Sequence, residues 1–138
     1  MSVMTGPTTD TDAAVPRRVL IAEDEALIRM DLAEMLREEG YDIVGEAGDG
    51  QEAVELAELH KPDLVIVDPP RSGLGDRVAR ALASADAPRL TYVSCDPATL
   101  ARDLVPLQAA GYRVEEVHLV DLFPQTYHLE TVVQLVRG

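Results

Sequence analysis

Apolar runs alternate with amphipathic segments along most of the chain, and together they predict an α/β domain. Short runs rich in Val, Ile and Leu are typical of buried strands, whereas apolar residues three or four positions apart are typical of a helix packed on a sheet. The predicted strands are 18–22, 41–47, 64–68, 89–95, 113–120 and 128–136, and the predicted helices are 26–39, 51–60, 73–85 and 97–110. Units of this length predict a parallel sheet with right-handed crossovers.

The run Leu64-Val65-Ile66-Val67 is the most strongly apolar of the predicted strands, which favours a central position with both faces buried. Asp68 follows, and then Pro69, which has no N–H for a sheet hydrogen bond. The strand is therefore predicted to end at Asp68, with the carboxylate at its carboxyl end. In open α/β sheets ligands bind at that edge.

Three further features of the pattern give specific expectations. The segment 121–127 is too short for a crossover helix, so the strand at 128–136 is predicted to run antiparallel to its neighbours. Pro106 lies inside the predicted fourth helix and is expected to kink or restart it. In the first helix, the residues expected near one inward face are Leu27, Met30, Leu32, Ala33 and Leu36.

Composition adds bounds on the class of protein. The chain has 138 residues, of which 46% are hydrophobic, enough for one domain with its own core. Residues 1–16 are rich in Thr, Asp, Gly and Pro and are predicted to be a disordered leader, which leaves 17–138 as a single α/β domain. No apolar run approaches the length of a membrane span, and the single cysteine favours a reducing cytoplasm.

Charge divides the chain at Asp68. Residues 1–68 contain 17 acidic and 5 basic side chains, a net charge of −12, whereas residues 69–138 contain 8 and 7, a net of −1. The first half repels nucleic acid, so RNA is not an expected partner. This change predicts that residues 17–68 and residues 69–138 are two halves of different origin.

The first half resembles a bacterial response-regulator receiver domain, of the actinobacterial kind that precedes an RNA-binding antitermination module. The matching segments are Ile21-Ala22-Glu23-Asp24-Glu25, Gly45-Glu46-Ala47-Gly48-Asp49-Gly50, Glu52-Ala53 and Pro62 to Asp68. The resemblance implies that Asp68 is the phosphoacceptor and that Glu23, Asp24 and Asp68 bind Mg²⁺, a cation that prefers carboxylate oxygens. It also implies a histidine kinase or a small phosphodonor as partner.

Two other positions of the receiver family bear on this hypothesis. Ser94 can stand in for the family's hydroxyl residue at the end of the fourth strand. Asp121 occupies the position of the family's lysine, which argues against normal switching although not against metal binding. The alternative interpretation is that the acidic cluster is only a solvated strand edge.

The second half closely resembles the RNA uracil-C5 methyltransferases. The matching segments are Asp68-Pro69-Pro70-Arg71, Tyr92 to Asp103 and Asp121 to Glu130. The resemblance implies that Cys95 adds to C6 of the uracil and that Glu130 removes the C5 proton after methyl transfer. Cys95 precedes a predicted helix, whose N-terminus favours a thiolate. The alternative interpretation is that both residues are inherited but idle.

Such methyltransferases bind S-adenosylmethionine on a glycine-rich loop after the first strand, and here that segment is Glu23-Asp24-Glu25-Ala26. The sequence analysis therefore predicts that S-adenosylmethionine does not bind and that the chain is not an enzyme. The leading hypothesis is an engineered chimera of the two families, a scaffold without native turnover. The two alternatives are a Mg²⁺-binding phosphoacceptor receiver and an RNA uracil-C5 methyltransferase.

The fold expected for either origin is a three-layer, doubly wound, mostly parallel sheet of six strands, a hybrid of the flavodoxin-like and Rossmann-like types. Numbered along the chain, the strands are predicted in the order 2-1-3-4-6-5 with strand 6 antiparallel. This order rests on loop lengths and on the two resemblances.

Overall fold

The computed structural model describes residues 17–123 and 128–138. The predicted leader, residues 1–16, and part of the predicted loop at 121–127 lie outside this range. The described elements are, in chain order, β1 (Arg18–Glu23), α2 (Ala26–Glu38), β2 (Asp42–Ala47), α3 (Gly50–His60), β3 (Leu64–Asp68), α4 (Asp76–Ala85), β4 (Arg89–Ser94), α5 (Pro97–Ala109), β5 (Tyr112–Phe123) and β6 (His128–Arg137).

The strands form one six-stranded sheet in the order β2-β1-β3-β4-β6-β5. β1 runs parallel to β2 and β3, and β3 runs parallel to β4. β6 lies antiparallel to β4 on one side and to β5 on the other. The predicted fold class, strand order and direction of the last strand are therefore confirmed.

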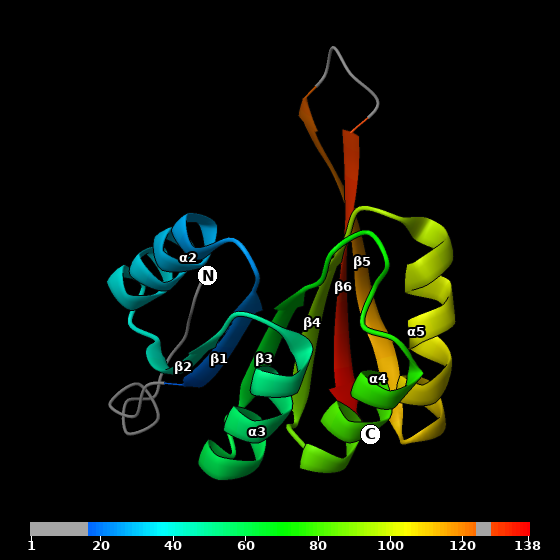
Figure 1. Ribbon diagram of the computed structural model, residues 1–138, viewed down its shortest axis with the longest axis horizontal. Coiled ribbons are helices and arrows are strands. Elements are labelled where there is room, and N and C mark those ends of the chain that lie inside the picture. Colours follow the sequence, from blue (N-terminus) through cyan, green and yellow to red (C-terminus); the bar gives the residue numbers. More distant parts are fainter. Residues whose placement is uncertain (1–16, 124–127) are drawn as a thin grey trace.

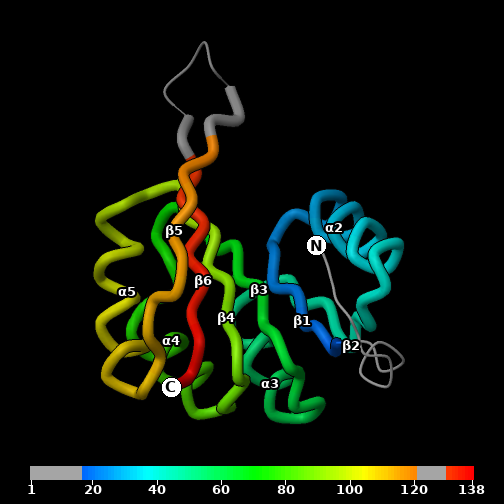
Figure 2. Tube along the Cα trace, turned by 180° about the vertical axis from the view of Figure 1, so that it is seen from behind, coloured from blue at the N-terminus to red at the C-terminus, as the bar shows by residue number. Residues whose placement is uncertain are grey.

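The helices form a layer on each face of the sheet, so the domain has three layers (Figures 1 and 2). α3, α4 and α5 cover one face. On this face Leu20 of β1, Val65 of β3 and Leu90 of β4 belong to the larger core. α2 covers the other face alone among the described helices, and its core is small: Val19, Ile21, Ala33 and Ile66 are its buried members. The alternation of strand residues between the two cores follows from the two-residue period of a strand.

The predicted inward face of α2 is partly wrong. Ala33 is fully buried and Leu36 packs against the small core, as expected. Leu27 and Met30, however, are 77% and 57% exposed. Because α2 has no neighbouring helix among the described residues, only a narrow stripe of it meets the sheet.

Two predicted boundaries and the predicted effect of Pro106 also need correction. α4 begins at Asp76 and not at residue 73, because Gly73 and Gly75 have φ angles of +78° and +86°, outside the helical region. β5 continues to Phe123, since its pairing with β6 extends through residues that were predicted to be loop. α5 is assigned as one helix with Pro106 inside it, so the proline does not restart the helix.

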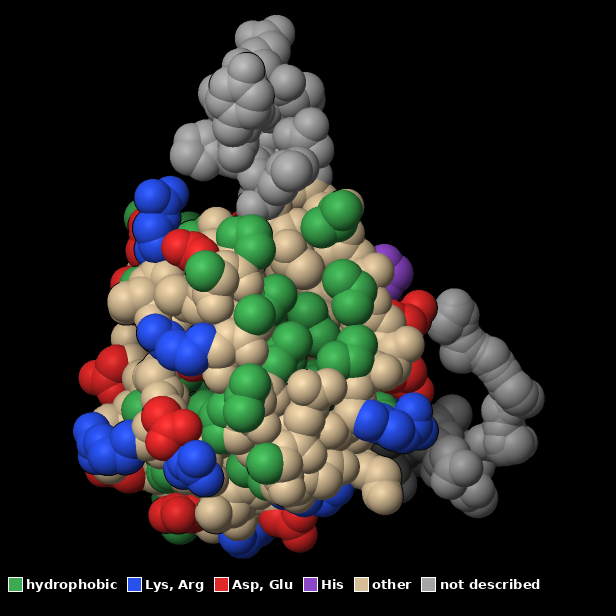
Figure 3. Space-filling model, turned by 90° about the vertical axis from the view of Figure 1, so that its right-hand side faces the viewer, with side chains coloured by type: hydrophobic (Ala, Val, Ile, Leu, Met, Phe, Trp, Pro, Cys, Tyr) green, Lys and Arg blue, Asp and Glu red, His purple; other side chains and the backbone are tan. Residues whose placement is uncertain are grey.

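The side of the molecule formed by α5 and the edge strand β5 has a patch of hydrophobic side chains (Figure 3). Val105, Val117 and Leu119 are 65%, 57% and 72% exposed. Within the described residues, no helix is long and apolar enough to cross a membrane. The polar residues considered next lie at the carboxyl ends of β1, β3 and β4.

Candidate functional site

Glu23 and Asp68 lie opposite each other at the carboxyl ends of two adjacent parallel strands. The register of β1 and β3 pairs Glu23 with Asp68. Both residues line a small recess of about 30 Å³, and Asp24, Pro69 and Pro70 line it as well. The structure therefore brings together the three carboxylates that the sequence analysis selected.

The surroundings of Asp68 favour its protonated form. Burial is the largest cause that raises the pKa of its carboxyl group, to about 8, and a side-chain hydrogen bond with Glu23 adds to the shift. The negative charges of Glu23, Glu130 and Asp24 act in the same direction. Close carboxylates repel each other and burial penalises the charge, so Asp68 holds its proton at neutral pH.

Local backbone contacts fix Glu23. Its side chain is buried, with 5% exposure, and its carboxylate accepts a hydrogen bond from the Glu25 amide at 2.9 Å. Its carbonyl oxygen accepts a hydrogen bond from the Arg29 guanidinium at 2.7 Å. Hydrogen bonds to the side chain and to the backbone carbonyl of Glu23 therefore stabilise the turn between β1 and α2.

The donor set of this recess suits a hard divalent cation, because carboxylate oxygens are the ligands that Mg²⁺ takes in proteins. Within residues 17–123 and 128–138, no three His, Cys, Asp or Glu side chains are already arranged as a metal-binding cluster. Metal binding by Glu23, Asp24 and Asp68 stays a prediction. It requires the three carboxylates to turn toward a shared cation.

Ser94, the predicted hydroxyl residue, is buried at the end of β4. Its hydroxyl donates a hydrogen bond to the Asp96 carbonyl at 2.8 Å and accepts one from the Asp96 amide at 3.1 Å. The hydroxyl is thus engaged in the turn before α5. The side chain of Asp121, the position of the missing lysine, lies outside the described side chains.

Cys95 directly follows β4, and Glu130 lies on the neighbouring strand β6. Cys95 is exposed and directly precedes Asp96, the N-cap of the 13-residue helix α5. The last pair in the register of β4 and β6 is Ser94 opposite Thr131. Because the two strands are antiparallel, Cys95 and Glu130 occupy the next position beyond that pair. Glu130 is half-buried, and its charge contributes to the pKa of Asp68.

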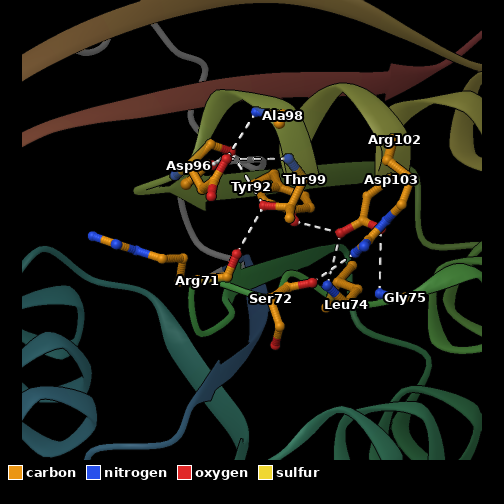
Figure 4. Close-up of polar contacts among 11 residues, drawn as sticks. Arg71, Ser72, Leu74, Gly75, Tyr92, Asp96, Ala98, Thr99, Arg102 and Asp103 are labelled. Atoms are coloured by element: carbon orange, nitrogen blue, oxygen red, sulfur yellow. Dashed lines mark hydrogen bonds and ion pairs between the residues drawn. The ribbon is translucent and has the colours of Figure 1, made fainter.

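A buried hydrogen-bond network connects the loop after Asp68 to α5 (Figure 4). At its centre is Asp103, which is 1% exposed. The Asp103 carboxylate accepts hydrogen bonds from the Tyr92 hydroxyl at 2.6 Å, from the Leu74 amide at 2.7 Å and from the Gly75 amide at 3.2 Å. It also pairs with the Arg102 guanidinium at 3.1 Å. All of these partners donate, as a buried carboxylate needs.

Two further contacts of this network hold the same loop, which we define as residues 71–75. The Thr99 hydroxyl donates to the Arg71 carbonyl at 3.0 Å, and Arg102 donates to the Ser72 carbonyl at 2.7 Å. Burial, and then the neighbouring Asp103, raise the pKa of Tyr92, so its hydroxyl keeps its proton. The loop is therefore fixed by side chains of α5 and β4.

The sequence analysis missed Asp103, although a signal was present. The buried positions of α5 include Leu100, Asp103 and Leu107, which have helical spacing. An aspartate on an apolar stripe needs partners in the interior. The sequence could not identify those partners, because two of them are backbone amides in a distant loop.

The model of the tRNA (Uracil-5-)-methyltransferase family matches residues 49–138. The "Uncharacterized RNA methyltransferase TTE1812" of Caldanaerobacter subterraneus is 49% identical over 92 residues, 64% of this chain and 20% of that protein. The "Transcriptional regulatory protein PdtaR" of Mycobacterium tuberculosis is 60% identical over 124 residues, 88% of this chain and 60% of that protein. The chain therefore spans only part of each of these relatives.

Two solved structures agree with this double similarity. The Pyrococcus abyssi tRNA (uracil-54, C5)-methyltransferase, solved with S-adenosyl-L-homocysteine, has a TM-score of 0.61 at 24% identity, covering 91% of this chain and 36% of that chain, and it supports the fold alone. The signal receiver domain of the putative response regulator NarL from Mycobacterium tuberculosis has a TM-score of 0.55 at 33% identity, covering 64% of this chain and 76% of that chain. Both predicted resemblances are confirmed.

The chain belongs to the tRNA (Uracil-5-)-methyltransferase family, with a receiver-like segment as well. The prediction that it is not an enzyme is therefore wrong, because this is a family of enzymes. That prediction rested on Glu23 to Ala26 as a missing cofactor loop. The family match begins at residue 49, downstream of this segment, so the segment gives no reason to exclude the family.

The comparisons support the two segments and do not support an engineered scaffold without turnover. The two matches overlap, since one covers 88% of the chain and the other 64%. A boundary between the halves at Asp68 thus stays a prediction.

Proposed function

We propose that this chain acts as a receiver-type phosphoacceptor module in which Asp68 accepts a phosphoryl group with the help of Mg²⁺. The observation that supports this most is the pairing of Glu23 with Asp68 at the carboxyl ends of β1 and β3, with Asp24 in the same recess. The similarity to a transcriptional regulatory protein and to a signal receiver domain also supports it.

The reaction is one displacement at phosphorus. An ionised oxygen of Asp68 attacks the phosphorus of a donor such as acetyl phosphate, and the bond from phosphorus to the bridging oxygen breaks. Acetate leaves with the electron pair of that bond, and Asp68 becomes an aspartyl phosphate. A phosphohistidine of a histidine kinase is the corresponding protein donor.

The acidic neighbours of Asp68 have a defined part in this proposal. Glu23, Asp24 and Asp68 would hold Mg²⁺, which supplies positive charge next to the transferred group. Glu23 is fixed by the Glu25 amide. Burial raises the pKa of Asp68 to about 8, so Asp68 has to lose its proton before it can attack.

The test is intact-mass spectrometry of the protein after incubation with acetyl phosphate and Mg²⁺. We expect one phosphoryl adduct on the parent and none on Asp68→Asn. Asp63→Asn is the matched control, because Asp63 directly precedes the first residue of β3, at the end of the strand opposite to Asp68. This variant should accept a phosphoryl group as the parent does. A folded parent without an adduct, or an adduct on Asp68→Asn, would contradict the proposal.

A second candidate is RNA uracil-C5 methylation, which the family match and the adjacent positions of Cys95 and Glu130 favour. In this reaction the Cys95 thiolate would add to C6 of the base, and C5 would then take the methyl group. Glu130 would remove the C5 proton while the bond between Cys95 and C6 breaks, which restores the ring and the thiolate. S-adenosylmethionine would supply the methyl group. A cavity of about 390 Å³, lined by Gly48, Asp49, Gly50, Pro69 and Pro70 among others, is of a size typical of small-molecule sites.

Two measurements test the second candidate. S-adenosylmethionine should raise the melting temperature of the protein, since a ligand that binds only the folded state stabilises it. Radiolabelled methyl groups should then reach RNA with the parent, and much less with Cys95→Ser or Glu130→Gln. The absence of both effects in a folded protein would reject this function for the chain as it stands.

A further inference from the structure

Among the described residues that line the recess around Asp68, none is basic, although the phosphodonor is an anion. Glu23, Asp24 and Asp68 are all acidic, and a phosphoryl donor such as acetyl phosphate is negatively charged at neutral pH. The sequence has Asp121 at the position where the receiver resemblance implies a lysine. Mg²⁺ alone would have to offset the repulsion between the donor and three carboxylates. A cationic side chain from another element would therefore help binding.

Arg77 meets this requirement by its position. It lies in the first turn of α4 and lines the cavity of about 390 Å³, together with Asp24, Pro69 and Pro70. It is the one cationic side chain among the described residues that line this cavity. Arg77 is exposed, and within residues 17–123 and 128–138 it makes no ion pair.

The start of α4, and with it Arg77, is fixed from outside the helix. Gly75 is the N-cap of α4 and supplies no side-chain cap. The carboxylate of Asp103, from α5, instead accepts hydrogen bonds from the Leu74 and Gly75 amides. Arg77 is two residues beyond Gly75, so the buried network of Asp103 determines where the first turn of α4 lies relative to the cavity.

We propose that Arg77 binds the negatively charged phosphodonor in this cavity and that Asp103 is the positioning residue for Arg77. The inference rests on the proposed phosphoacceptor function of Asp68. Guanidinium groups suit phosphate because their fork of donors can hold two oxygens at once. The positive end of the α4 helix dipole lies in the same first turn and acts in the same direction.

The experiment is the rate of Asp68 phosphorylation as a function of acetyl phosphate concentration at saturating Mg²⁺. Arg77→Ala should raise the half-saturating concentration about tenfold, which corresponds to one charge-assisted hydrogen bond. The maximal rate should change much less. Arg77→Lys should recover part of the loss, because it keeps the charge without the fork.

Arg80→Ala is the matched control, because Arg80 lies one turn further along α4 and pairs with Asp76 at 2.7 Å. It should leave the half-saturating concentration unchanged. The apparent affinity for Mg²⁺ should be the same in the parent and in Arg77→Ala. An Arg77→Ala variant with parental concentration dependence would overturn the role of Arg77, whereas a parent without any adduct would overturn the phosphoacceptor function itself.

The part played by Asp103 is tested by coupling. Tyr92→Phe removes one of the hydrogen bonds to Asp103 and leaves its other partners in place. It should raise the half-saturating concentration in the parent background and have little further effect in Arg77→Ala. Equal effects in both backgrounds would show that the network acts on something other than Arg77.

Discussion

Glu23 and Asp68 lie opposite each other on β1 and β3, and burial together with the neighbouring Glu23 carboxyl group raises the pKa of Asp68. Neither carboxyl group forms an ion pair with a basic side chain among the described residues. Asp68 therefore keeps a proton in the folded protein that an unfolded chain would release at much lower pH. This has a direct consequence for stability.

The free energy of unfolding should fall with pH because of this pair. The pKa of Asp68 is raised from 3.8 to about 8, so between these values the unfolded chain loses the proton while the folded chain keeps it. Ionisation then favours the unfolded state, and the penalty reaches its full size above about pH 8. Asp68→Asn should be more stable than the parent, by a margin that is larger at pH 8 than at pH 5.

Thermal or urea unfolding at the two pH values measures this margin. Asp31→Asn, which changes an exposed carboxylate on α2, is the control and should show no comparable difference. A margin that is equal at both pH values would contradict the raised pKa of Asp68.

The Tyr92–Asp103 hydrogen bond should contribute measurably to stability. Tyr92→Phe removes a hydrogen bond to a buried charge, which costs about 1–3 kcal/mol. Asp103→Ala also leaves the Leu74 and Gly75 amides without their acceptor and should cost more, about 3–5 kcal/mol. Urea unfolding compares the two, and a smaller loss for Asp103→Ala than for Tyr92→Phe would be inconsistent with the network.

Gly73 and Gly75 provide a matched pair of substitutions in one loop. Both have positive φ angles, so Ala at either position is strained by about 1–3 kcal/mol. A Cβ at Gly73 would also lie 2.6 Å from an Asp103 carboxylate oxygen, whereas nothing lies within 4 Å of a Cβ at Gly75. Gly73→Ala should therefore be clearly less stable than Gly75→Ala in thermal unfolding. Similar melting temperatures would mean that the loop moves away from Asp103 at little cost.

Cys95 should react with alkylating reagents in the folded protein. Its side chain is exposed at the start of α5. Iodoacetamide should add once to the parent under native conditions and not at all to Cys95→Ser, as read by intact mass. Cys95→Ser should change the free energy of unfolding by less than about 0.5 kcal/mol, as is usual at exposed positions. Protection of Cys95 until the protein unfolds would contradict the exposed position.

The sequence by itself determined the elements, the direction of the last strand and the carboxylates that end β1 and β3, whereas the predicted strand order also rested on the two resemblances. Apolar runs such as Leu64 to Val67 are continuous and have the length of strands buried on both faces, and the short segment before residue 128 requires an antiparallel return. Because parallel strands end at one edge, Glu23 and Asp68 could be placed together from the sequence.

The tertiary structure alone decided what surrounds these residues. Leu27 and Met30 have helical spacing but are exposed, since the burial of a helix depends on which other helices share its face. Asp103 meets the Leu74 and Gly75 amides almost thirty residues away, a contact that local pattern does not encode. The position of Arg77 beside the acidic recess follows from that contact, because backbone geometry at a helix start depends on partners distant in the sequence.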